Sequence, residues 1–502
     1  MEQGTTRAGR LTHVAPQQIL AHERIYAVCF ALTYFGLWSL PFWGPVLFPT
    51  FLVYIVLLYD IYWTAQALYS SAAALVSYRR MQAWTKVNWR ARYDQTGQTV
   101  QQLVVVPNFK ERTETLVATL ERLAQSDYPS DQLSVVLAME EREEGALAKA
   151  ESLKAQFAQN FAHLWITVHP LLSDETAWKG ANLSYALRQV KRQCEELGWN
   201  LSRVVITTVD ADTRLHPQYL AALAVQFLNV QQPTRKFFQG VLVLMNNVWE
   251  LHAPIRALSA FWTFTYVTGA THYQRMTTAV YSMSLRLLDE VGYWDPRVLV
   301  EDGHIFFRAF FALRGKVEIV PLYMPVGLDA VHAPSFWETI RIQYKQTSRW
   351  AWTVANLPFI ADQWSRHPEI PIWDKLRKCL PYVEGLLIIP ASWFVITFGV
   401  LVPPLINPAV QTTAFGIPLA VLAPLILSPS VIGVMVALGI NIRLRRQYAK
   451  RARPVSRLYE IIQIAEWLLL LVNAVFYFGV PYIQAYWRLL SGKDLHYEPT
   501  PK

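Results

Sequence analysis

The sequence predicts an α/β domain with a parallel, Rossmann-like sheet that is inserted between membrane-spanning helices. Its 502 residues are 53% hydrophobic and only 17% charged, whereas about a quarter of the residues of a soluble protein are charged. The apolar residues concentrate toward both ends of the chain, and residues 80–350 have the composition of a soluble protein. Within this middle part, short β-rich runs alternate with segments of helical periodicity, which is the pattern of βαβ units.

Two apolar segments precede the soluble part. They cover residues 25–42 and 46–65, and each is close to the roughly twenty residues that cross a hydrocarbon core. Trp-Gly-Pro at 43–45 predicts a short turn between them. Lys and Arg residues follow between positions 79 and 92, and the positive-inside rule therefore places the next domain in the cytoplasm.

Four buried strands are predicted in the soluble part, at 103–107, 133–139, 164–170 and 203–212. Helical periodicity follows the first strand at 111–125 and the third at 182–197. Right-handed crossovers join strands of this kind into a parallel sheet, and such sheets bind ligands at the carboxyl ends of their strands. The sequence VDAD at 209–212 lies at such an end.

Three further apolar stretches follow the soluble part, at 380–402, 413–440 and 461–485. A basic segment at 441–457 lies between the last two and is expected in the cytoplasm. The sequence thus gives about five spans, and a Pro-rich bend between positions 418 and 429 leaves a sixth open. The predicted division of the chain is a cytoplasmic tail (1–24), two transmembrane helices (25–76), the cytoplasmic α/β domain (77–350), an interfacial segment (351–379), about three transmembrane helices (380–490) and a C-terminal tail (491–502).

The formal net charge is +9, from 46 Lys and Arg against 37 Asp and Glu. The basic residues form no long patch with interleaved aromatic residues, and no nucleic-acid-binding motif is present, so we exclude a nucleic-acid partner. They cluster instead at the borders of the apolar segments. We therefore predict a multi-pass protein of the plasma (inner) membrane, with a cytoplasmic soluble domain and the lipid bilayer as a partner.

Asp210 and Asp212 stand at the end of the fourth predicted strand. Two carboxylates one residue apart at a strand end can share a divalent cation, which in turn binds a diphosphate. Hard oxygen ligands of this kind suit Mg²⁺ or Mn²⁺. An Asp-x-Asp pair alone is also common in solvated turns, so its place at the end of a buried strand is what favours a metal site.

Glu301 and Asp302 precede an apolar helix predicted at 304–313. A carboxylate in a cleft can take the proton of an attacking hydroxyl as a general base, and we expect Asp302 to do so with Glu301 beside it. The alternative is a helix N-cap pair, because Asp is favoured at that position. A helix N-terminus beside a cleft satisfies both interpretations.

Gln346, Arg349 and Trp350 form a third motif, and on a helix these positions neighbour one another. Arg can bind a diphosphate through two parallel hydrogen bonds and stabilise a leaving group, while Trp offers a flat apolar surface to a sugar ring. In isolation, the same residues suit an interfacial amphipathic helix. The interpretation therefore depends on the presence of Asp302.

Six motifs occur in a fixed order along the chain: VVVPNFKE (104–111), WKGANLSYAL (178–187), VDAD (209–212), LLDEVGYWD (287–295), VEDGH (300–304) and QTSRW (346–350). In this order they resemble the inverting family-two glycosyltransferases. Two apolar segments before the domain and several after it are similar to the membrane-embedded, cellulose synthase-like and hyaluronan synthase-like branch. The resemblance covers residues 25–490.

This resemblance implies a nucleotide-sugar-binding domain of the GT-A type, a nucleotide-sugar donor, a divalent cation and inversion at the anomeric carbon. The residues implied at the nucleoside and the donor are Pro107, Asn108, Glu111, Lys179 and Asn182. The resemblance also implies that Asp210 and Asp212 hold the Mg²⁺ or Mn²⁺ ion and the diphosphate. It makes Asp302 the base, and it implies binding of the diphosphate and the acceptor end by Gln346, Arg349 and Trp350.

Two departures from the family pattern leave the nucleotide and the acceptor open. The second predicted strand runs into MEEREEG at 139–145, where the family has an Asp-rich motif that contacts the base. Glu140 or Glu141 can substitute, since a carboxylate accepts from a uracil or guanine N–H; an acidic helix start is the equal alternative. Val300 stands where cellulose synthases have Thr, so the acceptor side can differ.

We expect from these motifs an enzyme, an inverting hexosyltransferase. It takes its sugar from a nucleotide sugar, with a UDP-sugar favoured, and builds a polysaccharide at the cytoplasmic face for export through its own transmembrane helices. The runner-up adds a single sugar to a lipid acceptor instead of extending a glycan. A nucleotide-sugar-binding scaffold or transporter is the remote alternative, because a binding module has no use for a base. A homo-oligomer and an accessory subunit are both left open.

Glu384 and Glu466 lie inside the predicted spans. A carboxylate at membrane depth is costly and is therefore a functional candidate. Either these residues line a polar route for a sugar chain, or they make a polar contact with another helix.

Overall fold

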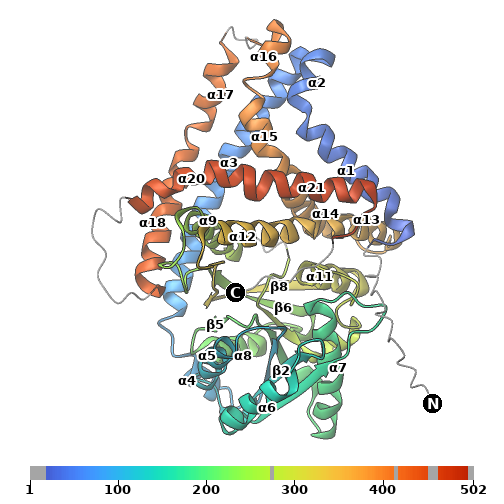
Figure 1. Ribbon diagram of the computed structural model, residues 1–502, viewed down its shortest axis with the longest axis vertical. Helices are drawn as coiled ribbons and strands as arrows, with labels where there is room; N and C mark the ends of the chain where they lie inside the picture. Colours follow the sequence, from blue (N-terminus) through green and yellow to red (C-terminus); the bar gives the residue numbers. More distant parts are fainter. Residues whose placement is uncertain (1–18, 272–275, 412–416, 450–461, 496–502) are drawn as a thin grey trace, which may run out of the picture.

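The computed structural model describes residues 19–271, 276–411, 417–449 and 462–495. Most of the predicted N-terminal tail (1–24) and the second half of the basic segment (441–457) lie outside these residues. In Figure 1, a sheet domain occupies the lower half of the molecule and a group of long helices rises above it.

An eight-stranded sheet forms the centre of the domain, in the order β3-β2-β1-β4-β7-β6-β8-β5. The four predicted strands are β1 (Gln101–Pro107), β2 (Leu133–Glu140), β3 (His163–His169) and β4 (Val204–Thr208). They pair in parallel, and β2 is buried along its whole length, as expected for a parallel strand covered on both faces. This arrangement confirms the predicted α/β, Rossmann-like class.

The other half of the sheet has no counterpart in the sequence prediction. It contains β5 (Arg214–Leu215), β6 (Lys236–Val243), β7 (Tyr281–Ser284) and β8 (Glu318–Gly327). β7 is antiparallel to both of its neighbours, β4 and β6, whereas β6 and β8 are parallel. The residues that follow β4 therefore lie where the sheet changes from parallel to mixed, which is the kind of place where α/β sheets bind ligands.

Helices cover both faces of the sheet. Alternate residues of β1 point to opposite sides, so that Leu103 and Val105 join one core, and Val104 and Val106 join the other. The first core is completed by α7 (Lys179–Glu196), α10 (Leu285–Glu290) and α11 (Glu301–Ala312). The second is completed by α5 (Thr113–Ala124), α6 (Ala146–Phe157) and α8 (Tyr219–Asn229).

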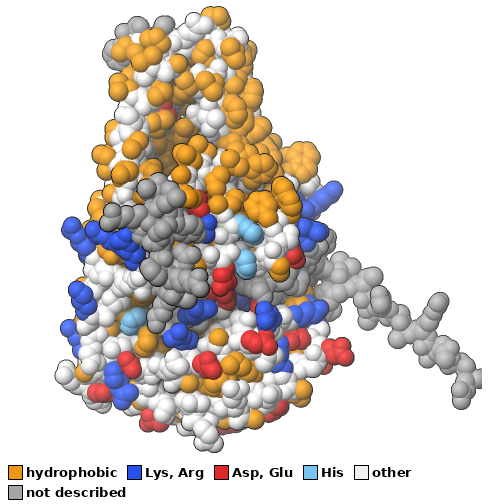
Figure 2. All heavy atoms as spheres, turned by 60° about the vertical axis from the view of Figure 1, so that its left-hand side comes forward, with side chains coloured by type: hydrophobic (Ala, Val, Ile, Leu, Met, Phe, Trp, Pro, Cys, Tyr) orange, Lys and Arg blue, Asp and Glu red, His pale blue; other side chains and the backbone are white. Residues whose placement is uncertain are grey.

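Four helices among the described residues are long and apolar enough to cross a membrane: Pro49–Trp84, Ile372–Phe398, Leu419–Tyr448 and Ile462–Ser491. A fifth is added if Ala21–Trp38 and Leu40–Leu47, which are bent by 75°, form one span. Figure 2 shows that the surface of this helical part is mostly apolar, while charged side chains concentrate on the sheet domain. These properties are consistent with a membrane protein.

The first two spans differ in detail from their prediction. Residues 43–45 do not form the turn; they lie inside α2 (Leu40–Leu47), whose Pro41 occupies the first helical turn, where proline is tolerated. The chain changes direction at Ser39, between α1 (Arg24–Trp38) and α2, and again at Phe48. The second segment belongs to α3 (Pro49–Trp84), a continuous helix of 36 residues.

Between the sheet and the rising helices lie α9 (Ala253–Thr271) and α12 (Phe336–Ala351), as Figure 1 shows. After α12 the chain forms α13 (Asn356–Arg366) and α14 (Ile372–Val383), then a π-helical turn (Glu384–Ile388) that leads into α15 (Ile389–Phe398). The last helices, α20 (Leu469–Asn473) and α21 (Val480–Ser491), run across the view alongside α12, whereas α3 and α17 (Leu419–Leu427) rise toward the apex.

Candidate active site

The end of β1 carries the first group of predicted residues. Pro107 closes the strand, and the backbone N–H of Asn108 donates to the carbonyl of Ala138 at 2.8 Å. The Asn108 side chain donates to Glu143 Oε2 at 2.7 Å, and the backbone N–H of Lys110 donates to the same oxygen at 2.6 Å. Glu143, which the motifs did not single out, therefore holds this loop in place.

Glu111 lies at the other end of the same loop. Its carbonyl accepts from Lys149 Nζ at 2.9 Å, and Lys149 also forms an ion pair with Glu143. Pro107, Asn108 and Glu111 are thus brought to one edge of the sheet through Glu143 and Lys149. Lys149 lies near the start of α6, the helix that follows β2.

The two glutamates at the end of β2 have different surroundings. Glu140 is the last residue of the strand and is buried, and it accepts from Arg142 Nε at 2.9 Å. Burial raises the pKa of the Glu140 carboxyl, and Arg142 opposes that shift. Glu141 is exposed. The alternative of an acidic helix start is wrong, since α6 begins only at Ala146; contact with a base stays a prediction for both residues.

The turn after β4 places Asp210 and Asp212 beside the start of α7. Lys179 Nζ donates to Asp210 Oδ1 at 2.8 Å, and Thr213 Oγ1 accepts from the backbone N–H of Asp210 at 2.9 Å. The Asp210 side chain is 31% exposed, whereas Asp212 is buried. Although burial lowers the pKa of Lys179, the carboxylates of Asp210, Asp302 and Glu301 together raise it.

These residues fit a divalent cation by their chemistry. Asp210 and Asp212 offer carboxylate oxygens, which are the ligands that Mg²⁺ and Mn²⁺ prefer. Although Lys179 pairs with Asp210, 31% of the Asp210 side chain is exposed, so an ion from solvent can reach this carboxylate. Asn182, one turn further along α7, is buried and donates to the carbonyl of Ala138 at 2.8 Å, so its amide group fixes α7 to the end of β2.

Glu301 and Asp302 form the first turn of α11. The N-cap of that helix is Val300, and neither carboxylate caps it, so the N-cap interpretation is wrong. Asp302 Oδ2 instead accepts from the backbone N–H of Ala279 at 2.9 Å. Its Oδ1 is buried and accepts no N–H or hydroxyl hydrogen bond from the described residues.

The carboxyl groups of Glu301 and Asp302 share a buried, negatively charged environment. Burial raises the pKa of both Glu301 and Asp302, and the negative charge of Asp302 raises the pKa of Glu301 further. Lys179 lowers both pKa values, whereas Asp210 raises that of Asp302. A proton entering this pair is therefore retained at a higher pH than an isolated carboxylate would retain it.

Trp178 joins this pair to the third motif. Its indole Nε1 donates to Glu301 Oε2 at 2.7 Å, and the guanidinium carbon of Arg349, from α12, lies 4.8 Å from the centroid of the indole ring. Glycine at position 180 favours the close approach of α7 to α11, because a Cβ there would lie 3.1 Å from Cβ of Glu301, a tight contact. Trp178 is the first residue of the motif WKGANLSYAL, but the sequence predicted no role for it.

The other two residues of the third motif lie on the same helix. Gln346 is buried and accepts from Gln343 Nε2 at 3.2 Å. The ring of Trp350 meets the ring of Trp262, from α9, edge to face at 5.4 Å. The structure thus brings together Lys179, Asp210, Glu301, Asp302 and Arg349, and places Trp350 toward α9 and the helical part.

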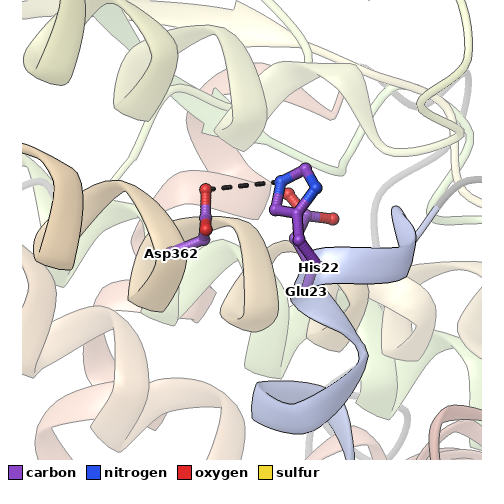
Figure 3. A group of neighbouring side chains, drawn as sticks. All are labelled: His22, Glu23 and Asp362. Atoms are coloured by element: carbon purple, nitrogen blue, oxygen red, sulfur yellow. Dashed lines mark ion pairs between the residues drawn. The ribbon is translucent and has the colours of Figure 1, made fainter.

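A second polar cluster lies on the other side of α11. His22, Glu23 and Asp362, shown in Figure 3, have ligand atoms within 4.8 Å of one another. His22 and Glu23 border a cavity of about 90 Å³, a volume that admits water, whose lining includes Val300, His304 and Trp352. Asp362 Oδ2 accepts from Arg366 Nε at 2.7 Å and faces His22 Nε2 at 3.5 Å. Arg366 supplies a positive charge there, so we assign no metal ion to this cluster.

Comparison with known proteins identifies the family. The model of glycosyl transferase family group 2 matches residues 205–479 of this chain. The chain belongs to that family. The matched part runs from β4 through the Asp210 turn, Asp302 and Arg349 into the last helix, so it contains most of the residues that the structure brings together. The resemblance to family-two glycosyltransferases is thereby confirmed.

Solved structures provide more distant matches, and no curated protein sequence matches this chain. The mannosyltransferase PcManGT from Pyrobaculum calidifontis, in complex with GDP-Man and Mn2+, is 16% identical over 84% of this chain and 99% of that one, with a TM-score of 0.38. Residues 1–349 of TarS from S. aureus, in complex with UDP-GlcNAc, are 12% identical over 71% of this chain and 95% of that one, with a TM-score of 0.34.

Proposed function

We propose that this glycosyltransferase moves a sugar from a nucleotide-sugar donor, with a UDP-sugar favoured, to an acceptor hydroxyl with inversion at the anomeric carbon. The observation that carries the proposal is the junction at the start of α7. There Lys179 contacts Asp210 at 2.8 Å, and Trp178 contacts both Glu301 and Arg349. The predicted diphosphate site and the turn that carries the predicted base thus contact adjoining residues at the start of α7.

In the proposed reaction, an acceptor hydroxyl attacks the anomeric carbon while the bond from that carbon to the phosphate oxygen breaks. Asp302 takes the hydroxyl proton, since its Oδ1 is buried without a hydrogen-bond donor of its own. Glu301 is the member of the pair that holds a proton first, because the charge of Asp302 adds to its burial. Lys179 and Arg349 stabilise the negative charge of the departing nucleoside diphosphate.

A Mg²⁺ or Mn²⁺ ion would be held by Asp210 and Asp212. When bound, such an ion neutralises the charge of the diphosphate as it departs. Lys179 holds Asp210 in position at the turn after β4. The loop of Asn108 and Glu111 is proposed to receive the nucleoside, with Glu140 or Glu141 as the contact to the base.

We further propose that the acceptor is a growing polysaccharide, which is made at the cytoplasmic face and exported through the helical part. A row of polar residues along α3 supports this. Gln66 donates to Glu384 at 3.2 Å, Tyr62 donates to the same carboxylate, and Tyr59 contacts Ser392 one turn further along. An acidic side chain is visible in a hollow of the apolar half in Figure 2. Hydroxyl and carboxylate groups at this depth suit the hydroxyl groups of a glycan.

Glu466 serves a different purpose. Both of its carboxylate oxygens accept from Arg256 of α9, at 2.7 and 2.8 Å, and both side chains are buried. This is the polar contact between helices that was one of the two alternatives for this residue. Of the two glutamates Glu384 and Glu466, Glu384 is therefore the one that we place on the export route.

The test is sugar transfer by the purified full-length protein in detergent, with Mn²⁺ or Mg²⁺ and a panel of UDP- and GDP-sugars. We expect turnover of one donor and its loss in Asp302→Asn. A ladder of long products supports the polysaccharide, whereas one sugar on an extracted lipid supports the runner-up. Binding of a nucleotide sugar without any turnover would favour a scaffold.

A further inference from the structure

Trp178 is a partly buried residue to which the proposed reaction assigns no role of its own. It stands at the N-cap of α7, between the sheet edge and α12. Its indole N–H and its ring face contact two different charged groups: the carboxylate of Glu301 at 2.7 Å and the guanidinium group of Arg349 at 4.8 Å from the ring centroid. Those two groups belong to separate helices, α11 and α12, and no hydrogen bond or ion pair is recorded between them within the part of the chain described here.

We propose that Trp178 is a positioning residue that sets Arg349 and the Glu301–Asp302 turn at a fixed distance from each other. The inference rests on the proposed function, because the two groups it aligns are the proposed stabiliser of the leaving group and the proposed base. The donor diphosphate at Arg349 and the acceptor hydroxyl at Asp302 are thereby held in a fixed relative position, with less freedom in the side-chain rotamers.

The hydrogen bond to Glu301 fixes the first turn of α11. An indole N–H can only donate, and Glu301 Oε2 accepts from it whether or not the other oxygen of that carboxyl group carries a proton, so the direction of this hydrogen bond is fixed. Gly180 brings the backbone of α7 against Glu301, which leaves the glutamate little freedom to turn away. Asp302 is the next residue on that turn, and its direction is therefore tied to the indole.

The stacking contact fixes Arg349. An arginine side chain has many rotamers, and holding it against an aromatic face lowers the entropy that is lost when it binds a ligand. A guanidinium group stacked on a ring directs its N–H groups outward in its own plane, toward an acceptor such as a diphosphate and not toward the ring. Trp178 thus orients Arg349 through its ring face.

Two substitutions separate these roles. Trp178→Phe keeps a ring for Arg349 but removes the N–H, which leaves Glu301 without its donor. Trp178→Leu removes both contacts. The matched control is Trp165→Phe, because Trp165 on β3 is a partly buried indole that stacks on His163 at 4.9 Å, away from the site. Rates come from nucleotide release with the donor that the wild type turns over, and affinities from calorimetry with UDP or GDP in Mn²⁺.

For Trp178→Phe we expect kcat to fall about tenfold, as for the loss of a donor to a buried carboxylate, with KM for the donor and nucleotide affinity within twofold of the wild type. For Trp178→Leu we expect the same loss of kcat, and nucleotide affinity weaker by about three- to tenfold. Trp165→Phe should change none of these quantities. Thermal unfolding midpoints show whether each variant is folded.

A double-mutant cycle with Glu301→Gln identifies the path of the effect. If Trp178 acts through Glu301, the two substitutions are non-additive in kcat. Additive effects, or a kcat of Trp178→Phe within twofold of the wild type, overturn the inference while leaving glycosyl transfer intact. If the wild type turns over no donor, the proposed function fails; equal nucleotide affinity of the two Trp178 variants then overturns the role toward Arg349 independently.

Discussion

Two ion pairs in this protein join the same kinds of groups in different surroundings. Lys179 and Asp210, at the edge of the sheet, are 2.8 Å apart with side chains 13% and 31% exposed. Arg256 and Glu466, between α9 and the C-terminal helix, are 2.7 Å apart and 8% and 7% exposed. The first pair can exchange a partner with a ligand that arrives from solvent. The second is closed and bidentate, so it holds two elements together.

This difference in exposure indicates which ion pair is available to bind a ligand. A buried pair gains stability only while both members are present, because either one alone is an uncompensated charge. A pair that is partly exposed adds little stability, so its place beside Asp302 is better explained by function. We therefore expect substitutions in the closed pair to affect folding, and those in the open pair to affect catalysis.

The largest effect is expected for Arg256→Leu. It leaves Glu466 buried without its partner, and such a loss costs about 3–5 kcal/mol of folding free energy. The measurement is thermal unfolding in detergent, with Arg256→Leu/Glu466→Leu as the control that removes both charges and should recover most of the loss. A single variant as stable as the wild type would show that the pair is not closed in solution.

For Asp210→Asn we expect the opposite pattern. The loss of a charge at the diphosphate should lower the transfer rate by about 10²-fold, while the unfolding midpoint stays near that of the wild type. Nucleotide release and thermal unfolding of the same preparation measure the two quantities. An unstable Asp210→Asn variant would contradict the comparison, because the open pair would then be structural.

The pH dependence of transfer should follow the carboxyl pair of Glu301 and Asp302. The base acts in its ionised form and its pKa is raised by burial, so activity should be lost as pH falls through that raised pKa. The ordinary pKa values of Asp and Glu are about 4, and the loss of activity should begin at a pH above them. As the pH falls, Glu301 takes up a proton first, and its side chain then lowers the pKa of Asp302 by hydrogen bonding. In Glu301→Ala, removal of that hydrogen bond should move the acid limb to higher pH. The profile of kcat/KM against pH measures the shift, and an unchanged limb would mean that the two groups do not interact.

The smallest effect is expected for Glu384→Gln. An amide oxygen still accepts from Tyr62 and Gln66, so stability should change by less than about 1 kcal/mol. Initial transfer should stay within twofold of the wild type, whereas the length of the product should fall if Glu384 lies on the export route. Product ladders on gels measure that length, and an unchanged ladder removes Glu384 from the route.

The sequence predicted one half of the fold better than the other. β1 to β4 are continuous apolar runs separated by amphipathic helices, and such a pattern has only one common arrangement. The strands β6, β7 and β8 are separated by the helices α9, α10 and α11. Their order in the sheet depends on contacts between residues that are distant in the sequence. The local periodicity of the sequence does not determine the order of these strands.

The residues of the candidate site divide in the same way, into those that the sequence predicted and those that it did not. Asp210, Asp302 and Arg349 could be recognised because they stand in spaced motifs, and the structure brings them to one place. Glu143 and Trp178 received no role, although they stand in the quoted segments MEEREEG and WKGANLSYAL, because each acts through contacts across the fold, among them those to Asn108 and to Glu301. Glutamate and tryptophan are also ordinary residues in an acidic loop and at a helix start, so the residue type alone predicts no role.

The length of α3 has a mechanical consequence. Its 36 residues extend over about 54 Å, whereas a hydrocarbon core is only about 30 Å thick. The remainder reaches the sheet, where Arg80 donates to the hydroxyl of Tyr323 on β8 at 2.6 Å. Where α3 crosses a bilayer, a change in its tilt would be transmitted along this single helix to β8. Bilayer thickness would then act mechanically on the domain that carries Asp302.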